Sequence, residues 1–323
     1  MKPKCVVTLE LPEDITALLG AHYDLVEWSG RDRGDVEGLS AVLADAEGLL
    51  CTLSTPITEE LIAHSSALKV ISTISVGVDH IDLVAATAHG VAVGHTPGVL
   101  VESTADLALA LMLAVTRRIS EADHWIRAGH WQEGWQSDLL LGTDLSQSTV
   151  GIVGLGPIGM AVAQRLKAFG SRIVAWNRTP KVIDGVEMVD LETLFAVSDV
   201  VTLHTALTVE TRHIANQARL ASMRDGAVII NTGRGPLVDE EALIAELTTG
   251  RLRAGLDVFQ QEPLPSRHPL LSLPNAVLLP HVGSATRSTR LAMVQRALDN
   301  LHAGVADEPV PYCANPEVYG VRQ

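Results

Sequence analysis

The chain has 323 residues, of which 47% are apolar and 19% charged, and its formal net charge is −14. This composition excludes a disordered chain and suffices for about two domains. The acidic balance makes nucleic acid and anionic membranes poor partners. An anionic substrate or cofactor therefore requires basic residues placed locally at its site.

The first third of the chain alternates short apolar strands with helical segments, which is typical of a parallel sheet. Pro12 and Pro56 indicate helix starts, and Gly20 and Gly90 indicate helix ends. The predicted strands cover residues 5–11, 25–28, 49–53, 70–75 and 91–95, and the predicted helices cover 13–19, 58–64 and 82–89.

A long helical segment is predicted next, over residues 103–128. Its apolar residues, which include Leu107, Leu111 and Ile119, fall on more than one face. Because a helix that is apolar all round is usually buried, we expect this segment to pack between domains or against a second subunit. A homodimer is the resulting prediction.

The middle of the chain contains six candidate strands, at 150–153, 173–176, 200–204, 228–231, 255–258 and 277–279. Helical stretches at 158–169 and 240–248 lie among them, as in the doubly wound dinucleotide-binding architecture. A last helix, from about 285 to 304, is expected to return to the first domain. The predicted fold class is therefore α/β, with two open doubly wound parallel-sheet domains and an active-site cleft between them. The flavodoxin-like substrate domain comprises residues 1–100 plus 286–323, and the Rossmann dinucleotide-binding domain comprises 101–285.

The cysteines and the apolar runs indicate the compartment. Cys5, Cys51 and Cys313 have no CxxC or metal-ligand spacing, which suits a reducing compartment and predicts no metal site. No signal-peptide pattern is recognisable at the N-terminus, and the longest apolar run, 107–115, is well short of the ~20 residues of a membrane span. We expect a soluble cytoplasmic protein.

A glycine-rich turn, GLGPIG at residues 154–159, follows the strand 150–153 and opens the helix 158–169. In this context its glycines permit a tight turn, close approach of a pyrophosphate and close packing of helix on strand. The helix N-terminus adds free N–H groups and a positive dipole end. The alternative is an ordinary βα turn. The predicted cofactor-binding residues of the turn are Gly154, Gly156, Pro157, Ile158 and Gly159.

Cofactor preference is predicted from the end of the next strand. An NAD-selective site carries Asp or Glu there, about 20 residues after the glycines, but this chain has Asn177, Arg178 and Thr179. A guanidinium pairs well with a 2′-phosphate. The pattern therefore predicts NADPH as cofactor, with NADH possible if Arg178 is only a solvated surface residue.

Three ionisable residues follow candidate strands, where doubly wound sheets hold their ligands. Arg234 lies in NTGRG at 231–235, Glu262 in GLDVFQQEP at 255–263, and His281 in LPHVGSA at 279–285. Taken singly, each has an ordinary reading as a loop charge, a turn residue or a structural histidine. Together they predict an acid–base site beside the cofactor.

These segments resemble the D-isomer-specific 2-hydroxyacid dehydrogenase family, and particularly its glyoxylate/hydroxypyruvate reductase branch. The resemblance extends from about residue 48 to 311 and includes SVGVDHID at 75–82, TPGVL at 96–100 and STVG at 148–151. It implies an oxidoreductase that reduces small 2-keto acids, such as glyoxylate or hydroxypyruvate, to 2-hydroxy acids by hydride transfer.

The resemblance also implies roles for single residues. His281 would donate the proton to the substrate carbonyl oxygen, Glu262 would hold the other ring nitrogen, and Arg234 would bind the substrate carboxylate. The remaining implied substrate-binding residues are Val76, Gly77 and Leu53. The remaining implied cofactor-binding residues are Thr104, Thr205, Thr232, Gly233, Asp257 and Gly283.

The sequence departs from the family at two places, of which only the second, at Leu139 and Leu140, bears on the choice between hydroxypyruvate and glyoxylate. Ala206 stands where many relatives carry proline, and Leu139 and Leu140 stand near the position where hydroxypyruvate reductases carry an aromatic residue. A dehydrogenase for another short or sugar-derived keto acid is one alternative. A cofactor-gated, corepressor-like scaffold without turnover is the alternative from another class, although no disordered tail or basic patch favours it.

Overall fold

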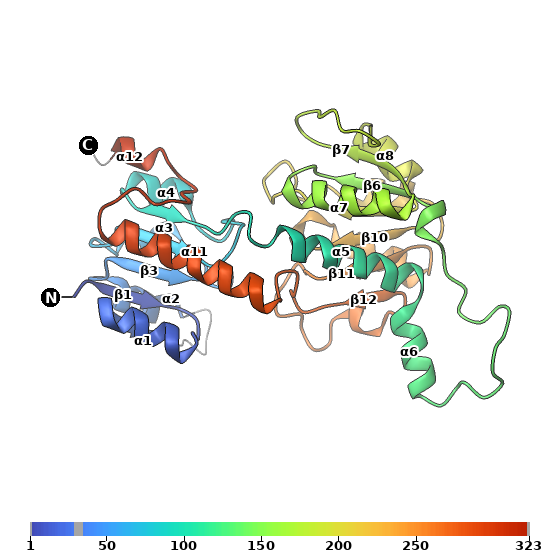
Figure 1. The fold of residues 1–323 in the computed structure, drawn as a ribbon, viewed down its shortest axis with the longest axis horizontal. Coiled ribbons are helices and arrows are strands. Elements are labelled where there is room, and N and C mark those ends of the chain that lie inside the picture. The colour runs from blue at the N-terminus through green and yellow to red at the C-terminus, as the bar shows by residue number, and fades with distance from the viewer. Residues whose placement is uncertain (1, 29–34, 322–323) are drawn as a thin grey trace. The chain divides into compact units, whose positions relative to one another are not determined.

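The protein is described by a computed structural model over residues 2–28 and 35–321, so Met1 and the last two residues of the predicted first domain lie outside the described part. The chain divides into two compact units, Met1–Val99 with Thr286–Gln323 and Leu100–Ala285. These boundaries lie within one residue of the predicted ones. Figure 1 labels the elements of both units.

The first unit contains a parallel sheet with the order β2-β1-β3-β4-β5 over the described residues. Every residue of β3 and β4 is buried, as in parallel strands covered on both faces. The order is that of flavodoxin-like sheets and reverses between β1 and β3. The strands are β1 Lys4–Val7, β2 Asp24–Glu27, β3 Gly48–Cys51, β4 Val70–Thr73 and β5 Ala92–Gly94.

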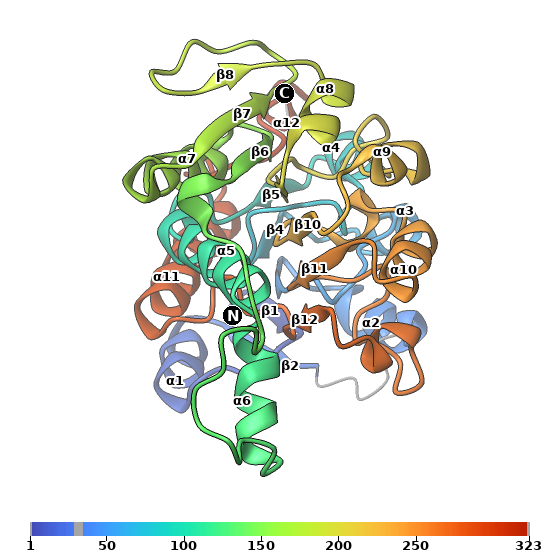
Figure 2. The same ribbon diagram turned by 90° about the vertical axis from the view of Figure 1, so that its right-hand side faces the viewer.

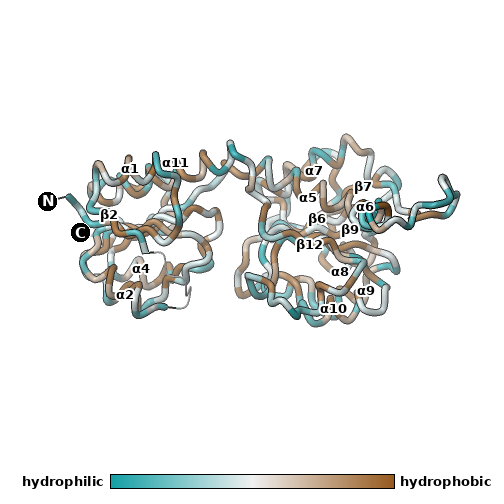
Figure 3. The backbone as a smooth tube through the Cα atoms, turned by 90° about the horizontal axis from the view of Figure 1, so that it is seen from below, coloured by the Kyte–Doolittle hydropathy of each residue, from teal (hydrophilic) through white to brown (hydrophobic). Residues whose placement is uncertain are grey.

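Helices cover both faces of this sheet, with α1 and α11 on one side and α2 and α4 on the other (Figure 3). The last long helix, α11, belongs to this unit as predicted, and Ser72 Oγ of β4 donates to the carbonyl oxygen of Ala297 at 2.7 Å. Its close approach requires glycine, because a Cβ on Gly304 would lie 2.4 Å from Val70 Cβ. The helices are α1 Glu13–His22, α2 Val36–Leu43, α3 Glu59–Ala63, α4 Leu83–Ala88, α11 Arg287–Val305 and α12 Val318–Val321.

Several predicted boundaries in this unit are wrong. The helix predicted to stop at Gly20 continues to His22, since a single glycine is tolerated inside a helix. The helix predicted over 58–64 agrees within one residue at each end, and it begins at Glu59, where the side chain of Thr58 caps the Leu61 amide. The first strand ends at residue 7 rather than 11, and α2 was not predicted.

The second unit contains a parallel sheet with the order β12-β11-β10-β9-β6-β7-β8 over the described residues. It includes the six predicted strands and one more, the two-residue β8, which pairs with β7. The order reverses between β6 and β9, which is where doubly wound sheets bind ligands. The strands are β6 Thr149–Val153, β7 Arg172–Trp176, β8 Glu187–Met188, β9 Val200–Leu203, β10 Val228–Asn231, β11 Arg253–Leu256 and β12 Ala276–Leu278. The predicted α/β class is confirmed.

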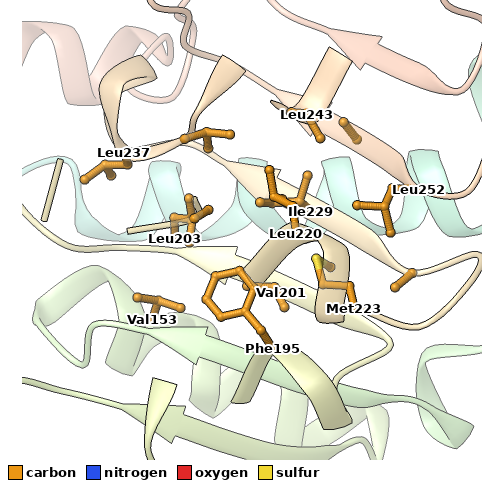
Figure 4. Close-up of a cluster of buried hydrophobic side chains, with 14 of the residues drawn as sticks. Val153, Phe195, Val201, Leu203, Leu220, Met223, Ile229, Leu237, Leu243 and Leu252 are labelled. Carbon is orange, nitrogen blue, oxygen red and sulfur yellow. The ribbon is translucent and has the colours of Figure 1, made fainter. Parts of the chain in front are cut away.

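Helices α5 and α7 cover one face of this sheet, and α9 and α10 the other (Figure 2). Each face has its own apolar core, and Figure 4 shows one of them, built around Phe195, Val201 and Ile229. The helices are α5 Val101–Thr116, α6 Ile119–Arg127, α7 Pro157–Phe169, α8 Leu191–Val197, α9 Gln217–Ser222 and α10 Glu240–Thr248, with 3₁₀ turns η1 Leu145–Gln147, η2 Gly235–Leu237 and η3 Pro269–Ser272.

The predicted single helix over 103–128 is wrong, because it is two helices. Arg118 takes the left-handed conformation, with a φ of 54°, and pairs with Glu121. Helix α5 is buried along much of its length, whereas α6 has no buried residue and Ile119 is 53% exposed. Of these two helices, α5 belongs to the core and α6 lies on the surface. No helix in the described ranges is long and apolar enough to cross a membrane.

Candidate active site

The glycine-rich turn joins β6 to α7 at the point where the sheet order reverses. Gly154 has a φ of +99°, and a Cβ on Gly159 would lie 2.0 Å from the carbonyl oxygen of Gly154. A Cβ on Gly156 would meet no described atom within 4 Å, so the turn is open on that side. Pro157 and Ile158 form the start of α7. The arrangement fits a pyrophosphate at a helix N-terminus.

The backbone N–H and C=O of Leu155, in this turn, each form a hydrogen bond with a side chain. Asn177 Oδ1 accepts from the Leu155 amide at 2.9 Å, and Lys181 Nζ donates to the Leu155 carbonyl oxygen at 2.6 Å. Asn177 Nδ2 donates to the carbonyl oxygen of Thr179 at 2.7 Å, while Arg178 is exposed. Two cations, Arg178 and Lys181, thus stand where an NAD-selective site has a carboxylate. Lys181 is not among the cofactor-binding residues predicted from the sequence.

Two predicted cofactor residues carry hydroxyls that need a partner. Thr205 follows β9 and Thr232 follows β10, and their Oγ1 atoms are buried with no hydrogen-bond partner among the described residues. Leaving a buried hydroxyl unsatisfied costs about 1–3 kcal/mol. Both hydroxyls are therefore suited to bind a polar ligand at the carboxyl ends of these strands. The glycine turn lies at the carboxyl end of β6 in the same sheet.

His281 and Glu262 form an ion pair, with 2.7 Å between Nδ1 and Oε2. Glu262 Oε1 accepts from the Phe259 amide at 3.0 Å. Burial alone would raise the pKa of Glu262, but the hydrogen bond and charge of His281, the Phe259 amide and the charge of Arg234 together lower it. The ionised carboxylate accepts the Nδ1 proton, which leaves Nε2 as the second functional nitrogen of the ring.

The backbone around Arg234 is fixed by two contacts. Asn231, which is buried, accepts from the Gly233 amide through Oδ1 at 3.0 Å and donates to the Arg234 carbonyl oxygen through Nδ2 at 2.8 Å. Gly235 lies against the next segment, because a Cβ there would lie 1.8 Å from the carbonyl oxygen of Phe259. The structure thus brings Arg234, Glu262 and His281 into one region of the second unit.

Asp257 holds the segment that carries His281. Its Oδ1 accepts from the Val282 amide at 2.7 Å and its Oδ2 from the Gly283 amide at 2.8 Å. His281 is left-handed, with a φ of 54°, and such a conformation persists only where its surroundings enforce it. Burial raises the pKa of Asp257 against these two amides. Thr104 Oγ1 donates to the Gly283 carbonyl oxygen at 3.3 Å, so both predicted cofactor residues also position the histidine.

The other predicted substrate residues belong to the first unit, which is described by itself. Val76 and Gly77 follow β4, and the carbonyl oxygens around them are occupied: His95 Nδ1 contacts that of Val76 at 2.9 Å, and Ser75 Oγ donates to that of Gly77 at 2.7 Å. Within the described residues, the amide N–H groups of Val76 and Gly77 make no hydrogen bond. Leu53 is half-buried in the turn after β3. Two oriented amides of this kind fit a carboxylate.

The described residues contain no group of three or more His, Cys, Asp or Glu arranged to hold a metal ion. Four residues near the site were not predicted. Asn231 stands in the NTGRG segment and acts through local contacts with Gly233 and Arg234. Lys181 and the pair Glu240 with His268 make contacts between segments distant in the sequence and stand in no motif that would have marked them.

A family model described as "D-isomer specific 2-hydroxyacid dehydrogenase, NAD binding domain" matches residues 109–283. The chain is 44% identical to a glyoxylate reductase from Thermofilum pendens, over 99% of this chain and 97% of that protein. It is 40% identical to glyoxylate/hydroxypyruvate reductase B from Citrobacter koseri, over 99% and 100% of the two chains. A solved NADPH-dependent glyoxylate/hydroxypyruvate reductase from Sinorhizobium meliloti, in complex with NADP and malonate, matches with a TM-score of 0.88 and 33% identity, covering 98% of each chain.

Proposed function

Because the chain belongs to the D-isomer specific 2-hydroxyacid dehydrogenase family, we propose that it reduces small 2-keto acids, glyoxylate foremost, to 2-hydroxy acids with NADPH as the preferred cofactor. Family membership confirms the resemblance found in the sequence. Relatives named glyoxylate reductase and glyoxylate/hydroxypyruvate reductase support this choice of substrate.

The His281–Glu262 pair is the observation that carries the proposal. With Nδ1 held by Glu262 at 2.7 Å, Nε2 is the nitrogen that protonates the carbonyl oxygen of the keto acid. The carboxylate stabilises the imidazolium before this transfer and fixes the ring orientation. A nicotinamide cofactor, when bound, supplies the hydride.

Arg234 binds and polarises the substrate. Its charge already acts on Glu262, so it lies in the region of the acid–base pair, and its planar fork suits a carboxylate. The amides of Val76 and Gly77 in the first unit make no hydrogen bond among the described residues and suit a carboxylate. Arg234 supplies local positive charge in a chain whose net charge is −14.

The preference for NADPH rests on Arg178 and Lys181. Both follow β7, where the missing carboxylate removes a repulsion for a 2′-phosphate, and Lys181 Nζ is 2.6 Å from the carbonyl oxygen of Leu155 in the glycine turn. The glycine turn, Thr205 and Thr232 would hold the rest of the dinucleotide.

A panel of keto acids assayed with both reduced cofactors tests the proposal. We expect the highest kcat/KM with glyoxylate and NADPH, lower values with hydroxypyruvate, and the lowest with longer or sugar-derived keto acids. Equal or better use of NADH refutes the cofactor preference alone. If NADPH binds but no keto acid is turned over, the proposed reductase activity is refuted and a cofactor-gated scaffold is favoured.

We also propose that the chain forms a homodimer through α6 and the segment after it. This helix has no buried residue, and Trp125, Trp131, Trp135 and Leu141 expose 37%, 55%, 87% and 62% of their surfaces. Exposed apolar groups gathered in one segment mark association surfaces. Light scattering should give twice the mass of 34.4 kDa, and a Trp131→Ser/Trp135→Ser variant should lower it. A monomeric wild-type mass refutes the dimer.

A further inference from the structure

A second histidine–carboxylate pair lies in the same unit as the His281–Glu262 pair. Glu240 is the first residue of α10, and its Oε1 is 3.2 Å from Nε2 of His268. Both side chains are 16% exposed, against 27% and 29% for His281 and Glu262. His268 Nδ1 accepts from the Leu270 amide at 3.4 Å, so the proton is on Nε2 and faces Glu240.

The other oxygen of Glu240 binds the loop that carries Glu262. Its Oε2 accepts from the Gln260 amide at 3.1 Å. The preceding amide, that of Phe259, donates to Glu262 Oε1 at 3.0 Å. Two successive amides are therefore held by two carboxylates, one of which pairs with His281 and the other with His268.

The peptide between Phe259 and Gln260 also supports the segment of Arg234. A Cβ on Gly235 would lie 1.8 Å from the Phe259 carbonyl oxygen and 2.5 Å from the Gln260 nitrogen. A shift of this peptide would therefore move the residue after Arg234 and the residues before Glu262 together.

An acidic residue in the first turn of a helix has an ordinary role, because it complements the helix dipole. Glu241 occupies the same first turn and is exposed, so it shares that role without the bond to Gln260. A comparison of variants at Glu240 and Glu241 therefore distinguishes an effect on the helix dipole, which both residues share, from an effect on the loop, which only Glu240 contacts.

We propose that Glu240, held in place by His268, is a positioning residue for the acid–base site, fixing the Phe259–Gln260 peptide and through it both Glu262 and Arg234. This inference rests on the proposed function for its kinetic consequence. Glu240 is not proposed to touch the substrate or the cofactor.

The kinetic test compares Glu240→Ala, Glu240→Gln and His268→Asn with the control Glu241→Ala. Glu240→Ala should lower kcat about 10-fold, because a shift of Glu262 and Arg234 misplaces the groups that act on the substrate, and raise KM for glyoxylate, with NADPH affinity unchanged. The pH profile of kcat is measured for each variant beside wild type. Glu240→Gln keeps an acceptor for the Gln260 amide but turns its NH₂ group toward the Nε2 proton of His268, so its kcat should lie between those of Glu240→Ala and wild type.

His268→Asn removes the contact with Glu240 but preserves the local fold, because the shorter asparagine side chain can still cap η3. It should change kcat in the same direction as Glu240→Ala, by less, and it carries the test if Glu240→Ala does not fold. Glu241→Ala should match wild type. If Glu240→Ala and His268→Asn match Glu241→Ala in kcat and pH profile, or lose activity only in proportion to melting temperature and NADPH affinity, the proposal is overturned.

A readout without turnover keeps the two proposals apart. In protein labelled with ¹⁵N-histidine, the Nδ1 resonance of His281 reports its contact with Glu262, and His281→Asn assigns it. We expect Glu240→Ala to change the chemical shift of this resonance, because the contact with Glu262 changes, and Glu241→Ala to leave it unchanged. This holds even if wild type reduces no keto acid, in which case only the proposed function fails. An unchanged resonance in Glu240→Ala overturns the positioning role.

Discussion

Replacing Glu262 by glutamine tests the acid–base pair with little change of shape. Two donors converge on this side chain, His281 Nδ1 at 2.7 Å and the Phe259 amide at 3.0 Å, each on its own oxygen. A carboxylate accepts both, whereas an amide has one oxygen and one NH₂ group. In Glu262→Gln, either the Nδ1–H of His281 or the Phe259 N–H therefore meets the NH₂ group, which is itself a donor, and loses its hydrogen bond.

The size of the effect follows from the bond that is lost. A hydrogen bond to a charged group contributes about 1.5–3 kcal/mol, and every 1.4 kcal/mol is about tenfold. The pair is 27% and 29% exposed, so solvent screens it in part and the lower half of that range applies. We expect kcat for glyoxylate reduction to fall about 10- to 50-fold, with NADPH affinity unchanged because Glu262 is not part of the glycine turn.

The assay follows loss of the NADPH absorbance band across pH, with Glu241→Gln as the control for removal of one exposed carboxylate. If Glu262→Gln keeps the kcat and pH profile of wild type, the ion pair has no part in proton transfer and the reasoning is refuted.

Three further outcomes are expected. Lys181→Met should lower kcat/KM with NADPH about 10-fold, by loss of a charge-assisted contact, and leave that with NADH unchanged; equal losses with both cofactors would contradict a 2′-phosphate role. Gly235→Ala places a Cβ 1.8 Å from the Phe259 carbonyl oxygen, so the melting temperature should fall about 3–10 °C and kcat should fall with it; an unchanged kcat would show that the two segments move independently. Burial lowers the pKa of His204 from 6.5 to about 4, so the unfolded chain takes up a proton first and stability declines as pH falls from 6.5 to 4. His204→Asn should therefore lose less melting temperature by calorimetry between neutral pH and pH 4 than wild type does, and an identical loss would argue against that burial.

Strong local patterns predicted most of the strands. Strand β10 and helix α10 agree with their predicted bounds, because a buried apolar run and the N-cap Asp239 define them locally. The helix break at Arg118 was missed because a left-handed arginine has no sequence signature. Strand β8 was missed because two residues at a sheet edge show no periodicity.

The candidate site divides in the same way. His281, Glu262 and Arg234 stand in recognisable segments after strands, and the sheet order explains why those segments lie near one another. Lys181 and Glu240 stand in no recognisable motif, because their roles depend on contacts with residues distant in the sequence. Lys181 contacts the Leu155 carbonyl oxygen, 26 residues away, and Glu240 contacts the Gln260 amide, 20 residues away. Such contacts exist only after the chain has folded.

Helix α11 has a consequence for the order in which the protein is built on the ribosome. Residues 1–99 are synthesised first, yet the face of their sheet at Gly48 and Val70 is covered by Leu301 and Gly304 near the end of the chain. The stretch 100–285 is continuous and has all its own helices before α11 emerges. The unit whose translation begins first is therefore the last to be completed, and its sheet keeps an uncovered apolar face until α11 has been synthesised.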